Sequence, residues 1–174
     1  MKKRREFLET IKNFNPNYDM EAIAHAYDVA EKMHRGQLRK SGEPYLIHPM
    51  AVAEILADLG MDEETIIAGL LHDVVEDTEY TSEQLIDEFG EEIGLLVDGV
   101  TKLGSLKFKN KEERQVENLR KMFLAMSKDI RVLIIKLSDR LQRNEKSRRE
   151  FISDASHELK TPLASIKLLS ESII

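Results

Sequence analysis

The sequence contains no cysteine and no tryptophan, and aromatic residues make up only 6% of its 174 positions. Without cysteine the chain forms no disulfide and offers no thiolate ligand to a metal. The lack of cysteine also means that redox chemistry gives no information about the cellular compartment. These absences exclude disulfide-stapled folds and thiolate metal sites from the classes that the chain can belong to.

Long apolar runs are also absent, since no stretch approaches the roughly 20 residues that a membrane span needs. The first seven residues are basic but no apolar segment follows them, so we expect no secretory signal and a cytoplasmic protein. The formal net charge of −6 argues against a general nucleic-acid binder. It leaves room for a small phosphorylated substrate held by a local basic patch.

Apolar residues recur at helical spacing along most of the chain, which with 41% hydrophobic and 33% charged residues favours an all-α globular domain. The candidate N-caps are Tyr18 or Asp19 for the second helix, Thr81, and Asn110. His25 and His34 flank the second helix and are expected at the surface or at the edge of the core. The predicted helices cover residues 1–14, 20–34, 48–59, 62–78, 81–89, 90–103, 110–127 and 129–141.

The stretch Gly69–Thr78 combines an apolar helical pattern with four polar groups, and it is the strongest candidate for chemistry. Helical spacing places His72 over Glu76 and Asp73 over Asp77. Three carboxylates in one turn repel one another, and burying them unpaired costs roughly several kcal/mol. A divalent cation offsets that cost, so the stretch predicts a metal site.

Two further residues become candidates for the same metal site once this stretch is considered. His48 begins an apolar helix, where a single histidine is more often structural. Asp139 lies near the end of a nearly continuous apolar run, and Arg140 is the alternative, purely structural partner for its charge. Both residues are candidate companions of His72 and Asp73.

A glycine- and proline-containing loop at residues 36–45 carries two cations and a hydroxyl, Arg39, Lys40 and Ser41. These groups can form a phosphate-binding edge, or they can be an ordinary solvated charge pair. Lys102 is a second candidate phosphate contact, although a lone lysine is usually solvated.

The chain changes character at residues 142–150, which contain no apolar side chain. Residues 151–174 then form a heptad-like apolar seam that needs a partner helix. We expect one long amphipathic helix that projects from the domain and can pair with a second copy to form a homodimer. The predicted division is therefore residues 1–141, a polar junction at 142–150, and the helix 151–174.

Residues 1–141 resemble the N-terminal hydrolase domain of the RelA/SpoT bifunctional (p)ppGpp synthetase/hydrolases, a branch of the HD superfamily. The resemblance rests on several strings together, each weak alone. They are Ala26-Tyr-x-x-Ala30, His34-x-Gly36, Arg39-Lys-Ser-Gly-Glu-Pro-Tyr45, His48-Pro49, the stretch from Ala68 to Thr78, Val100-Thr-Lys-Leu103 and Lys136-Leu-Ser-Asp-Arg-Leu141.

This resemblance implies an enzyme that removes the 3′-pyrophosphate of (p)ppGpp in the stringent response, giving GDP or GTP. It implies that one Mn²⁺ is held by four ligands, namely His48, His72, Asp73 and Asp139. Glu76 and Asp77 would position and deprotonate the attacking water. The nucleotide would lie against Arg39, Lys40, Ser41 and Lys102.

The family pattern continues after Asp-Arg-Leu with His-Asn-Met-Arg-Thr, whereas this chain reads Gln142-Arg-Asn-Glu-Lys146. The Asn and Thr of that pattern help to hold the nucleotide, so we expect impaired turnover in a hydrolase domain lacking its later helices.

The segment Arg148–Leu163 resembles instead the H-box of a sensor histidine kinase in a two-component system. That resemblance implies a phosphoacceptor His157, an acid/base neighbour Glu158 and a phosphatase-assisting Thr161. Three interpretations follow: a (p)ppGpp hydrolase fragment, which we favour, a fragment of a histidine kinase, and a non-functional fusion.

Overall fold

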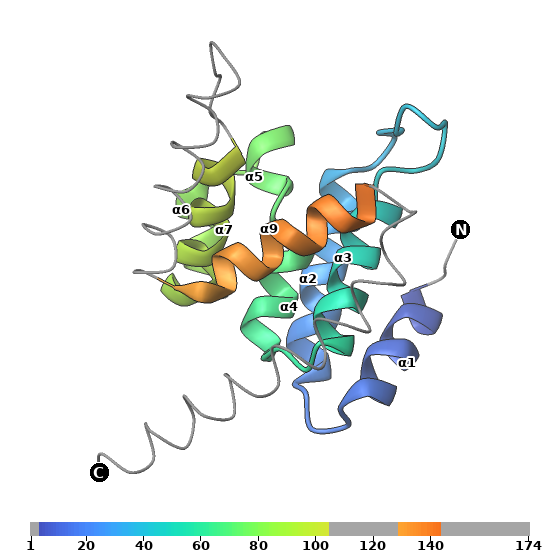
Figure 1. Cartoon of the computed structure of the whole chain (residues 1–174). Coiled ribbons are helices and arrows are strands. Elements are labelled where there is room, and N and C mark those ends of the chain that lie inside the picture. Colours follow the sequence, from blue (N-terminus) through green and yellow to red (C-terminus); the bar gives the residue numbers. More distant parts are fainter. Residues whose placement is uncertain (1–3, 105–128, 144–174) are drawn as a thin grey trace, which may run out of the picture.

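The computed structural model describes residues 4–104 and 129–143, and these residues form an all-α fold (Figure 1). The only β pairing among them is a single bridge between Leu38 and Pro44 in the loop after the second helix. The predicted all-α class is confirmed. The helices are α1 (Arg4–Phe14), α2 (Met20–Met33), α3 (Ile47–Asp58), α4 (Glu63–Leu71), α5 (Val74–Asp77), α6 (Ser82–Phe89), α7 (Glu91–Gly104) and α9 (Ile130–Arg143).

Side-chain caps set where several of these helices begin. The carboxylate of Asp19 accepts hydrogen bonds from the backbone at the start of α2, and Asp62 does the same for α4. Thr81 and Gln84 form a reciprocal capping box at the start of α6. The chain reverses after α6 at Gly90, whose φ of 90° is one that side-chain-bearing residues rarely adopt. Asp19 rather than Tyr18 caps α2, the predicted cap at Thr81 is confirmed, and the candidate cap Asn110 lies outside the described residues.

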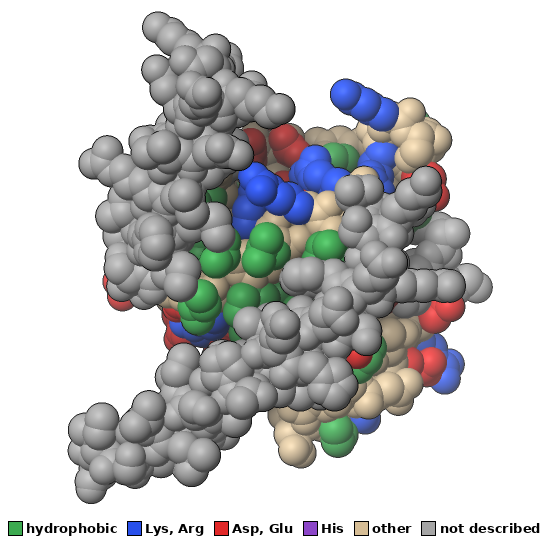
Figure 2. All heavy atoms as spheres, in the orientation of Figure 1, with side chains coloured by type: hydrophobic (Ala, Val, Ile, Leu, Met, Phe, Trp, Pro, Cys, Tyr) green, Lys and Arg blue, Asp and Glu red, His purple; other side chains and the backbone are tan. Residues whose placement is uncertain are grey.

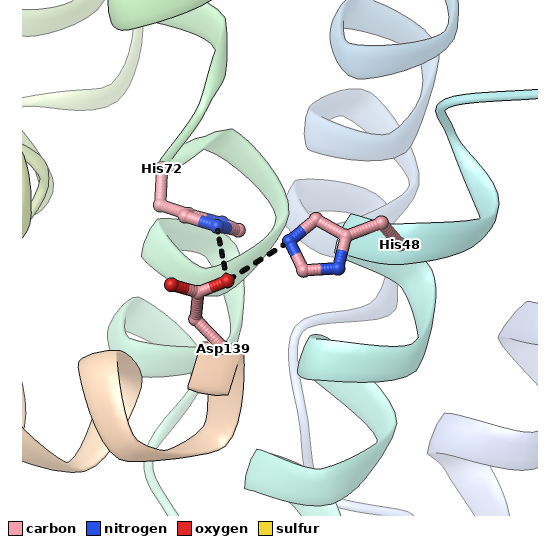
Figure 3. Close-up of side chains that lie close together, drawn as sticks. All are labelled: His48, His72 and Asp139. Carbon is pink, nitrogen blue, oxygen red and sulfur yellow. Dashed lines mark ion pairs between the residues drawn. The ribbon is translucent and has the colours of Figure 1, made fainter. Parts of the chain in front are cut away.

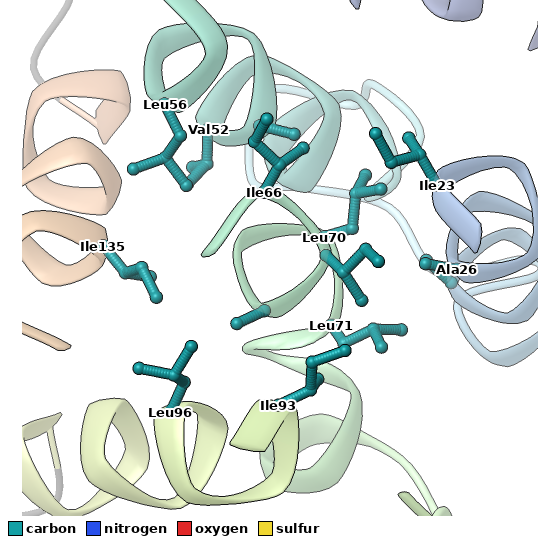
Figure 4. Packing of buried hydrophobic residues seen from close by; sticks show 14 of the residues in the cluster. Ile23, Ala26, Val52, Leu56, Ile66, Leu70, Leu71, Ile93, Leu96 and Ile135 are labelled. Atoms are coloured by element: carbon teal, nitrogen blue, oxygen red, sulfur yellow. The ribbon is translucent and has the colours of Figure 1, made fainter. Parts of the chain in front are cut away.

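Helix α4 is the centre of the fold, because it packs against α2, α3, α7 and α9. Every residue from Thr65 to Leu71 is buried, as expected for a helix that is surrounded on all sides. Figure 4 shows the α4 residues Ile66, Leu70 and Leu71 between side chains of those neighbouring helices. The residues that directly follow α4 are therefore held in place inside the protein.

The helix predicted over residues 62–78 is interrupted at His72 and Asp73, so the prediction of one continuous helix was wrong. In a continuous helix the Gly69 carbonyl would accept from the backbone N–H four residues later. Here it accepts from the His72 ring, with Nδ1 2.8 Å from the oxygen. The interruption places His72 and Asp73 between α4 and the short helix α5.

Helix α9 crosses the bundle and packs against α3, α4 and α7 (Figure 1). Its start is held by Arg131, whose Nη1 lies 2.7 Å from Glu92 of α7 and 3.3 Å from Asp62 at the start of α4. The helix continues to Arg143, two residues past the predicted boundary, and it buries Gln142. The C-terminal end of α9 therefore lies near the C-terminal end of α4.

Some sequence-based predictions lie outside the described residues. These are the helix over 110–127, the amphipathic helix over 151–174, and the phosphoacceptor group His157, Glu158 and Thr161. Among the described residues, no helix is both long enough and apolar enough to cross a membrane.

We predict that Gly99→Ala destabilises the fold by pushing α7 away from α9. A Cβ at position 99 would stand 2.8 and 3.0 Å from the two methyl groups of Val132, a buried β-branched residue with little rotamer freedom. Overpacking of about 1–3 kcal/mol outweighs the roughly 1 kcal/mol gained in helix propensity. Chemical denaturation should show a net loss of up to about 2 kcal/mol in unfolding free energy.

The matched control is Leu95→Ala in the same helix, whose side chain is 68% exposed. It should change the unfolding free energy by no more than about 0.5 kcal/mol. Equal stability of Gly99→Ala and the wild type would contradict the close packing of α7 on α9.

Candidate metal centre

Three residues from distant parts of the chain converge at the end of α4. His48 comes from the first turn of α3, His72 from the interruption after α4, and Asp139 from the last turns of α9. Each side chain offers one ligand atom, and these atoms all lie within 4.8 Å of one another. Figure 3 shows both imidazole rings directed toward the Asp139 carboxylate. All three residues are buried, with exposures of 1–2%.

The nitrogen atoms of the two rings have clearly different roles. His48 Nε2 lies 3.1 Å from Asp139 Oδ1, and His72 Nε2 lies 3.8 Å from the same oxygen. Neither Nε2 has a partner with hydrogen-bond geometry, although both are buried. The other nitrogen of each ring is engaged: His48 Nδ1 lies 2.7 Å from Gln142 Oε1, and His72 Nδ1 contacts the Gly69 carbonyl. The two Nε2 atoms are thus the ones available to a metal.

Asp73 brings a second carboxylate to the same point. Its Oδ1 lies 3.1 Å from His72 Nε2, and its Oδ2 lies 3.4 Å from His48 Nε2. The residue is only 5% exposed. The structure therefore brings together all four residues that the sequence predicted as ligands, although they are separated by up to 91 positions in the chain.

Burial and opposite charges act against each other on the pKa values of this cluster. Burial lowers the pKa of His48, but the contacts with Asp139 and Asp73 outweigh burial and raise that pKa to about 8. Burial raises the pKa of Asp139, yet the imidazoles and Arg143 hold it far below its ordinary range. The pKa of Asp73 is lowered in the same way, against the effect of burial, chiefly by His48. Both carboxylates stay ionised and need positive charge beside them.

Two basic side chains of α9 supply part of that charge. Lys136 Nζ lies 3.0 Å from Asp139 Oδ2, and Arg143 Nε lies 2.6 Å from Asp139 Oδ1. Arg143 also reaches Asp73, with Nη2 3.6 Å from Oδ2. The alternative partner considered from the sequence, Arg140, is exposed instead. The acids are thus paired by residues one turn away on either side of Asp139.

Tyr45 links the buried cluster to the exposed acid on α5. Its hydroxyl lies 2.6 Å from Asp73 Oδ2 and 2.8 Å from Asp77 Oδ2. Burial and these two carboxylates raise the pKa of Tyr45 well above its ordinary value, so the hydroxyl stays protonated and donates. The ring stacks on His34, with centroids 4.6 Å apart. Tyr45 therefore holds the carboxylates of Asp73 and Asp77 close to each other.

The loop after α2 is tied to α5 by the same network. His34 is 3% exposed, and its Nδ1 lies 2.8 Å from Gln37 Oε1. The amide nitrogen of Gln37 donates to the Asp77 carbonyl at 3.2 Å. Burial lowers the pKa of His34, which keeps its ring neutral. His34, expected at the surface or core edge, lies against the site instead.

The remaining predicted site residues lie outside the cluster. Glu76 and Asp77 are exposed on α5. Figure 2 shows lysine and arginine side chains along α9 next to acidic side chains at α5, so charges of both signs meet at this surface. Arg39, Lys40 and Ser41 lie in the loop between α2 and α3, where Ser41 donates to Glu43. Lys102 pairs with Asp98 of its own helix at 2.6 Å.

The donor set suits a divalent metal. Two imidazole nitrogens without hydrogen-bond partners face ionised carboxylates in a buried position, and a cation placed among them would satisfy all of these atoms. A mixture of imidazole and carboxylate, with no thiolate, fits first-row divalent ions. The arrangement can hold a metal deep in the protein, and Tyr45 connects Asp73 of the cluster to the exposed Asp77 on α5.

Sequence reasoning missed Tyr45, Lys136, Gln142 and Arg143. Tyr45 lies three residues before His48, so its place in the same motif was a usable signal. Lys136 and Arg143 lie three residues before and four residues after Asp139, a spacing that shares one helix face. Gln142 and Arg143 were assigned to a polar junction, and no local pattern distinguishes them from solvated residues.

Comparison with known proteins places the chain in a family. A family model described as "HD domain" matches residues 26–165. A "GTP pyrophosphokinase" of Myxococcus xanthus is 52% identical over 134 residues, covering 75% of this chain and 18% of that protein. A "Guanosine-3′,5′-bis(diphosphate) 3′-pyrophosphohydrolase" of Aquifex aeolicus is 47% identical over 167 residues, covering 91% of this chain and 23% of that protein.

The chain spans less than a quarter of the length of such curated relatives. A solved structure titled "A metazoan ortholog of SpoT hydrolyzes ppGpp and plays a role in starvation responses" is 32% identical, with a TM-score of 0.61. The match covers 76% of this chain and 73% of that one. The chain belongs to the HD domain family, in the branch of the RelA/SpoT proteins.

Proposed function

We propose that this chain is a metal-dependent hydrolase that removes the 3′-pyrophosphate of (p)ppGpp and leaves GDP or GTP. The observation that carries the proposal is the buried convergence of His48, His72 and Asp139 with two imidazole nitrogens free of hydrogen bonds. Relatives named as 3′-pyrophosphohydrolases of guanosine-3′,5′-bis(diphosphate), 47–59% identical to this chain, support the same reaction.

The proposed metal is Mn²⁺, held by His48, His72, Asp73 and Asp139. Imidazole together with hard carboxylate oxygens suits Mn²⁺ or Mg²⁺ better than a thiolate-seeking metal. When bound, the ion would polarise the phosphoryl group and lower the pKa of the attacking water. Tyr45, Gln142 and the Gly69 carbonyl orient three of the ligands through the hydrogen bonds described above.

Glu76 and Asp77 are the proposed proton acceptors. Water oxygen bonds to the phosphorus attached at the ribose 3′ oxygen, the bond to that oxygen breaks, and pyrophosphate leaves. The water proton passes to a carboxylate of α5, and the released 3′ oxygen takes up a proton. Tyr45 keeps Asp77 turned toward the buried cluster, because its one hydroxyl proton lies within hydrogen-bond distance of both Asp77 and Asp73. This contact through Tyr45 supports Asp77, more than Glu76, as the proton acceptor next to the proposed metal ligands.

The nucleotide's phosphates are proposed to meet basic groups on two elements. Arg39, Lys40 and Ser41 offer cations and a hydroxyl from the loop between α2 and α3, and Lys102 offers a cation from α7. Arg143 is half-exposed and already lies beside two carboxylates of the cluster, so its guanidinium also borders the proposed phosphate position.

A phosphoacceptor helix at His157, Glu158 and Thr161 receives no support from the comparisons. The HD family model reaches residue 165, and an alignment that covers 91% of the chain cannot end at residue 141. The division at residue 141, the homodimer through residues 151–174 and the impaired turnover stay predictions.

We predict that the full chain with Mn²⁺ releases pyrophosphate from ppGpp and that His72→Ala or Asp73→Ala lowers the rate by more than about 100-fold, because each change removes a ligand. Product release is measured by ion-exchange chromatography, with and without a chelator. Asp28→Asn, which removes a carboxylate paired with Arg4 on the distant α1–α2 surface, should keep the wild-type rate. Turnover that persists in chelator would contradict the proposal.

We predict that the stabilisation given by Mn²⁺ increases with pH between 6.5 and 8. His48 has an ordinary pKa of 6.5 and a raised pKa of about 8 in the metal-free fold. Its ion pairs therefore stabilise the metal-free protein fully below pH 6.5, and this stability is lost as pH rises through 8. Mn²⁺ must displace the same proton, so it binds more weakly at low pH.

Thermal unfolding with and without Mn²⁺ tests this expectation. The shift in melting temperature should be larger at pH 8.5 than at pH 6. In His48→Gln the difference between the two pH values should disappear. A shift that is independent of pH in the wild type would contradict the competition between proton and metal.

We predict that Tyr45→Phe lowers kcat by roughly 10–100-fold while the protein still binds Mn²⁺, because the hydroxyl that orients Asp73 and Asp77 is lost. Steady-state kinetics at saturating Mn²⁺ measures the effect. Tyr80→Phe is the matched control, since that hydroxyl contacts Glu88 of α6 instead. An unchanged kcat in Tyr45→Phe would remove this residue from the mechanism.

A further inference from the structure

Gln142 is the first residue at which this sequence departs from the family motif that ends in Asp-Arg-Leu141. Its side chain nevertheless contacts the proposed metal ligand His48. The residue lies three positions after Asp139 on α9, which places both side chains on one face of the helix. It is 6% exposed, and its Oε1 lies 2.7 Å from His48 Nδ1. A buried amide needs hydrogen-bond partners, and the His48 ring supplies one.

The ring of His72 illustrates what such a contact does. Its Nδ1 lies 2.8 Å from the Gly69 carbonyl, which can only accept a hydrogen bond. Nδ1 must therefore carry the proton, and in the neutral ring the lone pair belongs to Nε2, which faces the cluster. The backbone of α4 thus fixes His72 in the tautomer that binds a metal through Nε2.

His48 has no such carbonyl at its Nδ1, and its tautomer depends on a side-chain amide. An amide can accept through oxygen or donate through nitrogen. If Gln142 donated, His48 Nε2 would carry a proton and face Asp139 Oδ1 at 3.1 Å, which closes the position to a metal. If Gln142 accepts, Nε2 keeps its lone pair for the ion.

We infer that Gln142 is a positioning residue that accepts a hydrogen bond from His48 Nδ1 and thereby fixes the metal-binding tautomer of His48. The inference rests on the metal centre proposed above and adds to it. It makes α9 the source of both a ligand, Asp139, and the group that orients a second ligand. The residue taken from the sequence as the start of a polar junction is then part of the site.

Two variants of the same length separate acceptor chemistry from packing. Gln142→Glu keeps an oxygen acceptor at this position, whereas Gln142→Met fills the same space with no strong acceptor. In the full chain, Gln142→Met should weaken the Mn²⁺ association constant by roughly 10–100-fold, measured by isothermal titration calorimetry. Gln142→Glu should bind Mn²⁺ at least as tightly as the wild type.

Gln84→Met is the matched control for a merely structural effect. Gln84 accepts a hydrogen bond from the Thr81 backbone in the capping box of α6, away from the cluster. Its loss should lower the melting temperature and leave the Mn²⁺ affinity unchanged. Equal weakening of Mn²⁺ binding in Gln142→Glu and Gln142→Met would overturn the acceptor role.

The tautomer itself is measured by ¹⁵N NMR of histidine-labelled, metal-free protein at a pH where His48 is neutral. In the wild type the protonated nitrogen of His48 should be Nδ1, and in Gln142→Met a substantial Nε2–H population should appear. A wild-type His48 protonated at Nε2 would overturn the inference even if the variants fail to fold. Wild-type protein that binds no Mn²⁺ would instead refute the metal centre on which the inference rests.

Discussion

The structure depends on charged side chains that are concentrated in one buried position. Asp73 and Asp139 are ionised, buried and directed toward the imidazoles of His48 and His72. Carboxylates brought this close together in a protein interior require positive charge, and its loss would cost several kcal/mol, roughly. In the metal-free protein a protonated His48 and two basic residues of α9 provide it. A divalent ion provides more charge at the same point, and this is the physical basis of the proposed chemistry.

Three helices, α3, α4 and α9, bring these charged side chains together. Helix α4 is buried from Thr65 to Leu71, and just beyond its end the His72 ring contacts the Gly69 carbonyl, which orients a proposed ligand. Helix α3 begins beside this point and contributes His48. Helix α9 crosses the bundle and contributes Asp139 together with its neighbours on the same face. Rigid packing of α3, α4 and α9 thus sets the ligand geometry.

Much of this could be predicted from the sequence, and the failures have physical causes. Helix positions and the caps at Asp19 and Thr81 follow from local periodicity and hydrogen bonding, which are visible in one chain. The crowded acids of the Gly69–Thr78 stretch predicted a metal site because burying them unpaired is costly. The set of four proposed ligands came from the resemblance to the RelA/SpoT hydrolases. The interruption at His72 was missed because the apolar helical period continues through it in the sequence. Gln142 was missed because its burial is decided by α3, a partner 94 residues away in the chain.

The central claim is that the two Nε2 atoms and the buried carboxylates form one metal site, and pulsed electron paramagnetic resonance of the Mn²⁺-loaded chain tests it most directly. The account predicts modulation from two directly bound histidine nitrogens, reduced to one in His48→Gln, and one strongly bound Mn²⁺ per chain. A spectrum of Mn²⁺ coordinated only by oxygen, with no nitrogen modulation, would contradict it.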